Sequence, residues 1–311
     1  MIPFIKSIFN MINDNKRWFA GLAIIVAAFF LAQKIINNNP NVDKDSQFYV
    51  NSIYMSDGRI YSNYLDDNTK NMYDFIMDKI KRGKRVTQMT PQEYGCPDYR
   101  SCFLLMSDAT TAIWLDHPEL LSFASFDVQY KPDTNILTFR IRRSFKLPLM
   151  DKFGEMYINY KIDQIVKATE GYSDRAKIKY VYNWIGNHTK YDTIFTNDNK
   201  NQTIYSVFLN RNAVCAGFAK AAQVIFQRMG IKSYLVEGYT SGLHMWNIVE
   251  VDGKNYFFDS TVAACIRDDN AAYYNGLKQS EFKDYTVSHK AWYPPMATNE
   301  LFEKDDLKIE N

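Results

Sequence analysis

The residues best suited to chemistry lie in the second half of the chain. Cys215 stands in the stretch NAVCAGFAKA, and His244 and Asp259 follow it. A helix is predicted over 214–229, because apolar residues recur there at helical spacing and Gly230 follows as a stop signal. The unpaired N–H groups at a helix N-terminus favour negative charge, so a thiol in the first turn is suited to become a nucleophilic thiolate.

A β-hairpin is predicted over 244–262, where two β-rich runs flank Asp252-Gly253, a dipeptide suited to a two-residue type I′ turn. Counting outward from the turn gives three expected cross-strand pairs: Val251 with Lys254, Trp246 with Asp259, and His244 with Thr261. In this register His244 and Asp259 share one face as diagonal neighbours, about 7–8 Å apart at the backbone. A base and the carboxylate that orients it would complete a nucleophilic triad with the cysteine.

This order and spacing closely resembles the transglutaminase-like (papain-like thiol) superfamily, especially its bacterial exported members. The resemblance covers about residues 173–265, and its motifs are AVCAGFAKA, GIKSYLVEGY and HMWNIVEVDGKNYFFDST, with weaker support from YVYNWIGNHTKYD and TIYSVFLNRNAVC. The segment DHPELLSF (116–123), followed by a strand pair, also resembles the region upstream in those proteins. The resemblance implies that Cys215 is the nucleophile, His244 the base and Asp259 its orienter.

The same resemblance implies an α+β, papain-like fold, in which the cysteine helix packs on an antiparallel sheet that carries the histidine and the aspartate. Two departures from the family affect the expected groove: Phe218 replaces a frequent tyrosine, and STVAACIRDD after Asp259 lacks a frequent tryptophan. Four further residues are assigned to the oxyanion hole or substrate groove: Tyr205 as the first oxyanion candidate, Trp184 as its fallback, and Gly217 and Trp246 near the triad.

Composition describes an ordinary globular protein of 311 residues, 46% hydrophobic, with a net charge of +2. Acidic and basic residues are interspersed, so no basic surface field argues for a nucleic-acid partner. Cys96 and Cys102 lie in GCPDYRSC, expected to be a short loop, and an oxidising compartment would permit them to pair. A zinc site there would need two more ligands, and the expected chemistry needs no metal or organic cofactor.

The N-terminal part carries an uncharged apolar run over 18–32 that extends to Ile36, preceded by Lys6, Lys16 and Arg17. We expect a cytoplasmic segment 1–17, a transmembrane signal anchor 18–36 and a polar linker 37–47. A cleaved signal peptide and a buried core helix are the alternatives. The first is disfavoured because Phe30 stands where a small residue is expected in the cleavage pattern.

Two larger regions follow the linker. Residues 48–150 are predicted to be a mixed α/β region, with a helix over 64–84 and two strands over 123–143. Residues 151–311 form the expected catalytic domain, with its core at 173–265. Its other elements are helices over 155–169 and 173–189 and a strand over 232–239. Five further residues are interpreted as structural or chemically quiet: Asp116, His117, His188, Cys265 and His289.

These expectations describe a membrane-anchored, extracytoplasmic thiol enzyme that acts on peptide or side-chain amide bonds through an acyl-thioester. Water as the acceptor would make it a peptidase or amidase, and an amine would make it a transglutaminase. The expected partners are a protein or peptide substrate, with cell-wall peptides as candidates, and the membrane through 18–36. The alternative is a non-catalytic module of the same fold that binds cell-surface polypeptides.

Overall fold

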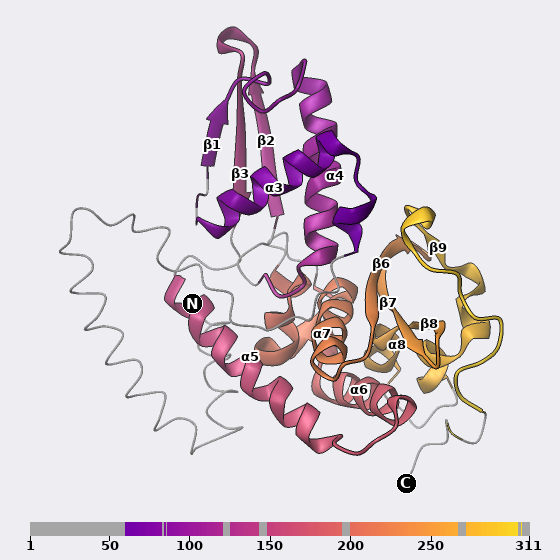
Figure 1. Cartoon of the computed structure of the whole chain (residues 1–311). Helices are drawn as coiled ribbons and strands as arrows, with labels where there is room; N and C mark the ends of the chain where they lie inside the picture. Colours follow the sequence, from indigo (N-terminus) through magenta and orange to yellow (C-terminus); the bar gives the residue numbers. More distant parts are fainter. Residues whose placement is uncertain are drawn as a thin grey trace.

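The computed structural model describes residues 60–82, 84, 86–120, 125–142, 148–194, 200–266, 272–303 and 306. Figure 1 shows an upper lobe, residues 60–142, above a lower body in which helices lie beside a sheet. Helices and mostly antiparallel sheets together make the fold α+β. The expected anchor 18–36 and linker 37–47 lie outside the described residues. Among the residues that are described, no helix is long and apolar enough to cross a membrane.

The upper lobe packs two helices against a three-stranded antiparallel sheet of order β1-β3-β2. Its elements are, in chain order, η2 (Tyr61–Tyr64), α3 (Asp67–Lys81), β1 (Val86–Met89), α4 (Tyr99–Asp116), β2 (Ser125–Lys131), η3 (Pro132–Thr134) and β3 (Ile136–Arg142). The predicted helix over 64–84 and strand pair over 123–143 are confirmed as α3 and as β2 with β3.

The start of α4 differs from the expected loop around the two cysteines. The Asp98 carboxylate accepts hydrogen bonds from the backbone N–H groups of Arg100 and Ser101, and this cap starts a helix at Tyr99, three residues before Cys102. Cys102 therefore lies in the first turns of α4, while Cys96 precedes the helix. The two cysteines are joined in a disulfide.

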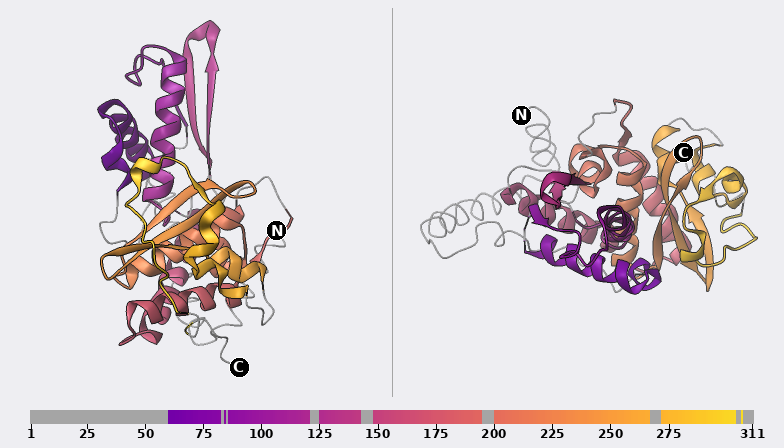
Figure 2. Two further views of the ribbon diagram at one scale, coloured as in Figure 1. Left: turned by 90° about the vertical axis from the view of Figure 1, so that its right-hand side faces the viewer. Right: turned by 90° about the horizontal axis from the view of Figure 1, so that it is seen from above.

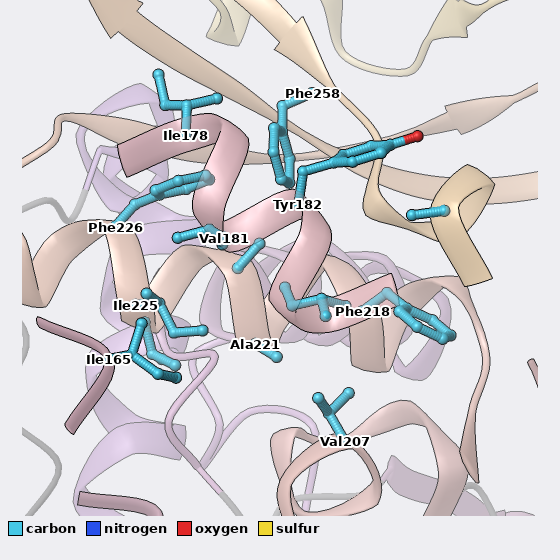
Figure 3. Close-up of a cluster of buried hydrophobic side chains, with 14 of the residues drawn as sticks. Ile165, Ile178, Val181, Tyr182, Val207, Phe218, Ala221, Ile225, Phe226 and Phe258 are labelled. Carbon is cyan, nitrogen blue, oxygen red and sulfur yellow. The ribbon is translucent and has the colours of Figure 1, made fainter. Parts of the chain in front are cut away.

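The lower body is built around one large hydrophobic cluster to which helices and the sheet both contribute (Figure 3). The first part of the lower body is mostly helical, with one short strand pair, β4 and β5. In chain order its elements are α5 (Pro148–Ala168), α6 (Asp174–His188), β4 (Lys190–Tyr191), η4 (Lys200–Gln202), η5 (Ser206–Asn210), β5 (Asn212–Ala213) and α7 (Cys215–Arg228). The helices expected over 155–169 and 173–189 are confirmed, and Ser173 is the cap of α6. Helix α5 begins earlier than expected and spans the expected domain boundary at 150.

A four-stranded antiparallel sheet of order β8-β7-β6-β9 covers one side of α7 (Figure 2). The remaining elements are β6 (Ser233–Tyr239), β7 (Leu243–Val251), β8 (Lys254–Phe258), α8 (Ser260–Cys265), η6 (Tyr273–Leu277), η7 (Gln279–Asp284), β9 (Thr286–Val287) and η8 (Lys290–Trp292). Helix η6 joins the main cluster through Tyr274 and Leu277, whereas η7 lies on the other face of the sheet, where Phe282 joins a second cluster around Trp246.

The hairpin turn follows the prediction, but the far end of its second strand does not. Val251 pairs with Lys254, and both Asp252 and Gly253 have positive φ, as a type I′ turn requires. The β7–β8 ladder ends where Asn247 faces Phe258. The expected pairs Trp246–Asp259 and His244–Thr261 are wrong, because the backbone N–H of Asp259 bonds to Gly276 O and the chain then turns into α8.

The upper lobe and the lower body share a hydrophobic cluster, to which α7 contributes Ala216 and Ala219. Tyr61 Oη donates a hydrogen bond to the backbone carbonyl of Leu235 in β6. The Lys220 ammonium on α7 lies 3.6 Å from the centre of the Trp114 ring on α4. The upper lobe is thus packed directly on the helix that begins at Cys215.

Candidate active site

Cys215 is the first residue of α7, as the sequence predicts, and its thiol is partly accessible. The preceding residue, Val214, has no polar side-chain atom with which to cap the helix. Val214 O accepts from the N–H groups of Gly217 and Phe218, but no backbone hydrogen bond uses the N–H of Cys215 in the part of the chain that the structure describes. One donor thus remains beside the sulfur for a developing negative charge.

His244 lies near the start of β7, where His244 Nε2 is 2.7 Å from Asp259 Oδ2. Asp259 immediately follows β8 and is 2% exposed. It also caps α8, because its Oδ1 accepts a hydrogen bond from the N–H of Thr261 at 2.9 Å. The aspartate therefore reaches the histidine from a helix cap and not from a paired strand position.

Cys215 also lies beside the His244 imidazole, near enough to influence its protonation. Since Nε2 is engaged by the carboxylate, Nδ1 is the ring nitrogen left to face the sulfur. Burial alone would lower the pKa of His244, but the hydrogen bond to Asp259 and the nearby Asp259 and Cys215 groups outweigh it and raise the pKa to about 10. The arrangement therefore favours an imidazolium between a carboxylate and a sulfur.

The Asp259 carboxylate stays ionised for a related reason. Burial alone would raise its pKa, but hydrogen bonds from His244, Tyr285 and Thr261 and the charge of His244 hold the pKa below its ordinary value. Tyr285 Oη lies 2.8 Å from Asp259 Oδ2, the same oxygen that binds the histidine.

Trp246 packs against His244 inside the protein and does not line a groove, contrary to expectation. Its side chain is fully buried, and its ring stacks on the His244 imidazole with centroids 5.8 Å apart. A residue without exposed surface cannot contact a substrate. Trp246 instead limits how far the imidazole can tilt toward the sheet.

The other three groove assignments also receive no support from their positions. Tyr205 is 4% exposed and belongs to the main hydrophobic cluster. Trp184 stacks on His188 and packs on Phe208, and neither is a residue of the triad. Gly217 faces neighbouring chain and not an open groove, because a Cβ there would lie 2.7 Å from both Asn201 O and Ser206 Oγ. A glycine is required at position 217 because α7 packs closely against η4 and η5 there.

Asp116 and His117 form a separate buried network in the upper lobe. Asp116 accepts hydrogen bonds from the backbone N–H groups of η2 and its flank, and His117 bonds to Tyr73 and Glu119. These bonds anchor η2 to the end of α4, which is a structural role. Among the described residues no three metal-ligating side chains come together as a metal site.

Two tyrosines near the triad were missed by reasoning from the sequence. Tyr285 touches Asp259 across 26 positions of sequence. Tyr191 in β4 stacks on Phe218, and burial together with the nearby Cys215, Cys265 and Asp259 raises its pKa. Neither contact has a signal in local spacing, because both depend on how distant segments pack.

Comparison with known proteins identifies the segment that contains this geometry. A family model described as the transglutaminase-like superfamily matches residues 161–259, from α5 to the aspartate. This segment belongs to the transglutaminase-like superfamily. The transglutaminase-like segment therefore contains Cys215, His244 and Asp259, but neither the upper lobe nor Tyr285.

Individual relatives of the transglutaminase-like segment are distant. Over 139 residues the chain is 23% identical to the kyphoscoliosis peptidase of Mus musculus, which covers 40% of this chain and 21% of that protein. A crystal structure of a TGase matches with 18% identity and a TM-score of 0.31, covering 45% of this chain and 44% of that one.

Two further solved structures cover similar shares of the chain. A putative cysteine protease from Cytophaga hutchinsonii matches with 14% identity and a TM-score of 0.29, covering 44% of this chain and 62% of that one. The periplasmic domain of TgpA from Pseudomonas aeruginosa matches with 13% identity and a TM-score of 0.28, covering 42% and 54%. This chain spans less than two thirds of every one of these relatives.

Proposed function

We propose that the protein is a cysteine-nucleophile enzyme that acts on peptide or side-chain amide bonds through a Cys215-His244-Asp259 triad. One observation supports this most directly. His244 hydrogen-bonds to Asp259, and Cys215, the first residue of a helix, lies near enough to the imidazole to raise its pKa. A cysteine that only fills the core has no need of an ion-paired imidazole beside it.

The first half-reaction forms a thioester. The Cys215 thiolate attacks the amide carbonyl carbon, a C–S bond forms, and the carbonyl oxygen takes up negative charge beside the N–H of Cys215. The His244 imidazolium then donates its proton to the leaving nitrogen as the C–N bond breaks. Asp259 holds the imidazole in place and stabilises its charge until the proton leaves.

The second half-reaction releases the acyl group. Neutral His244 takes a proton from water or from an amine, whose attack on the thioester carbon breaks the C–S bond and regenerates the thiolate–imidazolium pair. Water yields a carboxylic acid, and an amine yields a new amide. We favour hydrolysis, in line with the bacterial exported members that the sequence resembles.

For location we propose the extracytoplasmic side of a membrane, with residues 18–36 as the anchor. Two observations support this placement. The sequence over 18–32 is uncharged and apolar, and Cys96 is bonded to Cys102, as an oxidising compartment permits. On this basis cell-wall peptides are the first substrates to test. A reporter fused after Asn311 and active only in the cytoplasm would contradict the placement.

The test of the proposed activity is to trap the acyl-enzyme. The full-length protein is incubated with candidate cell-wall peptides, quenched in acid and digested, and the thioester adduct is located by mass spectrometry. We expect an adduct on Cys215 in the parent and none in Cys215→Ala. An adduct on neither, or binding of a peptide without turnover in both, would favour the non-catalytic binding module instead.

A further inference from the structure

Tyr285 lies against the triad although it is outside the transglutaminase-like segment, which ends at Asp259. Its hydroxyl is 2.8 Å from Asp259 Oδ2, while His244 Nε2 is 2.7 Å from the same oxygen. The second carboxylate oxygen accepts from the N–H of Thr261. The carboxylate is thus held by three donors from three different elements, and one of the three is a tyrosine hydroxyl.

The ring of Tyr285 is held by contacts with three other rings. It meets Trp246 edge-on, with centroids 5.0 Å apart and planes at 90°. It also packs on Phe282 at 4.6 Å and meets the edge of the His244 ring at 5.8 Å. Since Trp246 stacks under His244, the tyrosine contacts both the imidazole and its support.

The segment that carries Tyr285 is tied to the catalytic sheet on two sides. Strand β9 extends the sheet, where Val287 pairs with Gly238, the residue that faces His244 across β6 and β7. Further back, Gly276 O accepts the backbone N–H of Asp259 at 2.9 Å. The segment from η6 to β9 therefore holds Asp259 by its backbone and by its side chain.

We propose that Tyr285 is a positioning residue for the proposed triad, acting on His244 and Cys215 through the Asp259 carboxylate. The inference rests on the proposed function and adds a fourth side chain to it. The hydroxyl fixes the plane of the carboxylate, so that Oδ2 presents itself to Nε2 and Nδ1 stays aimed at the sulfur. It also shares the charge of Oδ2, which keeps the carboxylate ionised at lower pH.

The surroundings of Tyr285 and Asp259 determine which of the two holds the proton of their hydrogen bond. Burial and the adjacent carboxylate raise the pKa of Tyr285, so the phenol keeps its proton and acts as a donor. The hydrogen bond from Tyr285 in turn lowers the pKa of Asp259. The titratable groups around this carboxylate come from five further elements and are His244, Cys215, Tyr182, Tyr191 and Cys265. Histidine supplies the only positive charge among them.

The test measures the rate at which iodoacetamide alkylates Cys215 across pH 4 to 9, by mass spectrometry on the full-length protein. Tyr285→Phe keeps the ring on Trp246 and removes only the hydroxyl. We expect alkylation at acidic pH to fall about tenfold, because a hydrogen bond to a charged group is lost, and the acid limb to move to higher pH. Melting temperature is recorded for each variant.

Tyr234→Phe is the matched control, because Tyr234 belongs to the same buried cluster as Trp246 and Phe282. It should leave the pH profile unchanged. If Tyr285→Phe and Tyr234→Phe have the same profile as the parent, the positioning role is wrong, provided that His244→Ala still lowers alkylation. If alkylation of the parent shows no dependence on His244 at all, the proposed function itself fails.

Discussion

The Asp259 carboxylate has two roles: it caps a helix and it binds the histidine of the proposed triad. Its Oδ1 caps α8 through the N–H of Thr261, and its Oδ2 binds both His244 and Tyr285. A helix cap needs only an acceptor oxygen, whereas stabilising an imidazolium needs a negative charge. The two roles can therefore be separated by substitution.

We predict that Asp259→Asn separates them. The amide oxygen can still accept the N–H of Thr261, so α8 stays capped, and we expect the melting temperature to fall less than in Asp259→Ala. Without the charge His244 loses its main support, and we expect the alkylation rate of Cys215 to fall about tenfold to a hundredfold, as for the loss of a charged hydrogen bond. Asp259→Ala should lose both properties. Equal reactivity of Asp259→Asn and the parent would contradict the role of the carboxylate.

The raised pKa of His244 also makes a prediction about stability. The folded protein holds the imidazolium proton up to a pKa of about 10, against an ordinary value of 6.5. Its contribution to stability is therefore fully present below pH 6.5 and is lost as pH rises toward about 10. We expect the gap in unfolding free energy between the parent and His244→Ala to narrow over this range in denaturant titrations. A gap that stays constant with pH would show that the histidine is not held as an imidazolium.

At the scale of elements, the sheet brings together a histidine from β7 and the tyrosine immediately before β9. Their contact depends on Gly238 in β6, where a Cβ would lie 2.0 Å from Thr286 O and 2.7 Å from Trp246 Cη2. Any side chain at this position has to displace β9 or the tryptophan. The glycine therefore sets the distance between β9 and the rest of the site.

We predict that Gly238→Ala destabilises the protein by about 1–3 kcal/mol, as for an overpacked interior, and lowers the reactivity of Cys215. Gly242→Ala is the matched control in the adjoining turn, because nothing lies within 4 Å of a Cβ there. Thermal melts and alkylation rates of the two variants check this together. If Gly238→Ala has the melting temperature and the alkylation rate of the parent, β9 does not pack against Gly238 as described.

At the scale of the whole molecule, the upper lobe contacts the catalytic helix through a buried cation. Lys220 is 3% exposed and lies over Trp114 of α4. Burial lowers its pKa well below the ordinary value, and the nearby Glu237 and Glu119 offset only part of that effect. Within the described residues no carboxylate lies within ion-pair distance of its ammonium group.

We predict that Lys220→Met stabilises the fold. Below its ordinary pKa of 10.5 the unfolded lysine binds a proton more readily than the folded one, so the parent loses stability as pH falls. Methionine keeps an apolar stem without a charge, and we expect a gain of about 1–2 kcal/mol at neutral pH. The gain should shrink toward about pH 10 in urea unfolding. A loss of stability would show that the contact with Trp114 outweighs the cost of burial.

Much of this architecture could be predicted from local signals. The apolar spacing before Gly230 predicts α7, Asp252-Gly253 predicts the hairpin turn, and Ser173 predicts the start of α6. These features depend on a few neighbouring residues. The separation of helices from antiparallel strands followed from the same patterns.

The rest depends on contacts between distant segments. Asp259 leaves the strand because Gly276 takes its N–H, and Trp246 is buried because Tyr285 and Phe282 cover it. Gly217 is set by its fit against η4 and η5, although its place near the triad suggested a part in the substrate groove. None of these partners lies close enough in the chain to leave a periodic or turn signal.

The most direct test of the central claim compares the two free cysteines in one molecule. The full-length protein is treated with limiting iodoacetamide at neutral pH, and labelling of Cys215 and Cys265 is counted by mass spectrometry. Partial burial and the nearby Asp259 raise the pKa of Cys265, which makes it the internal reference. We predict that Cys215 is labelled at least about tenfold faster, and that His244→Ala removes the difference. Equal labelling of both thiols in the parent would contradict a thiolate–imidazolium pair at Cys215.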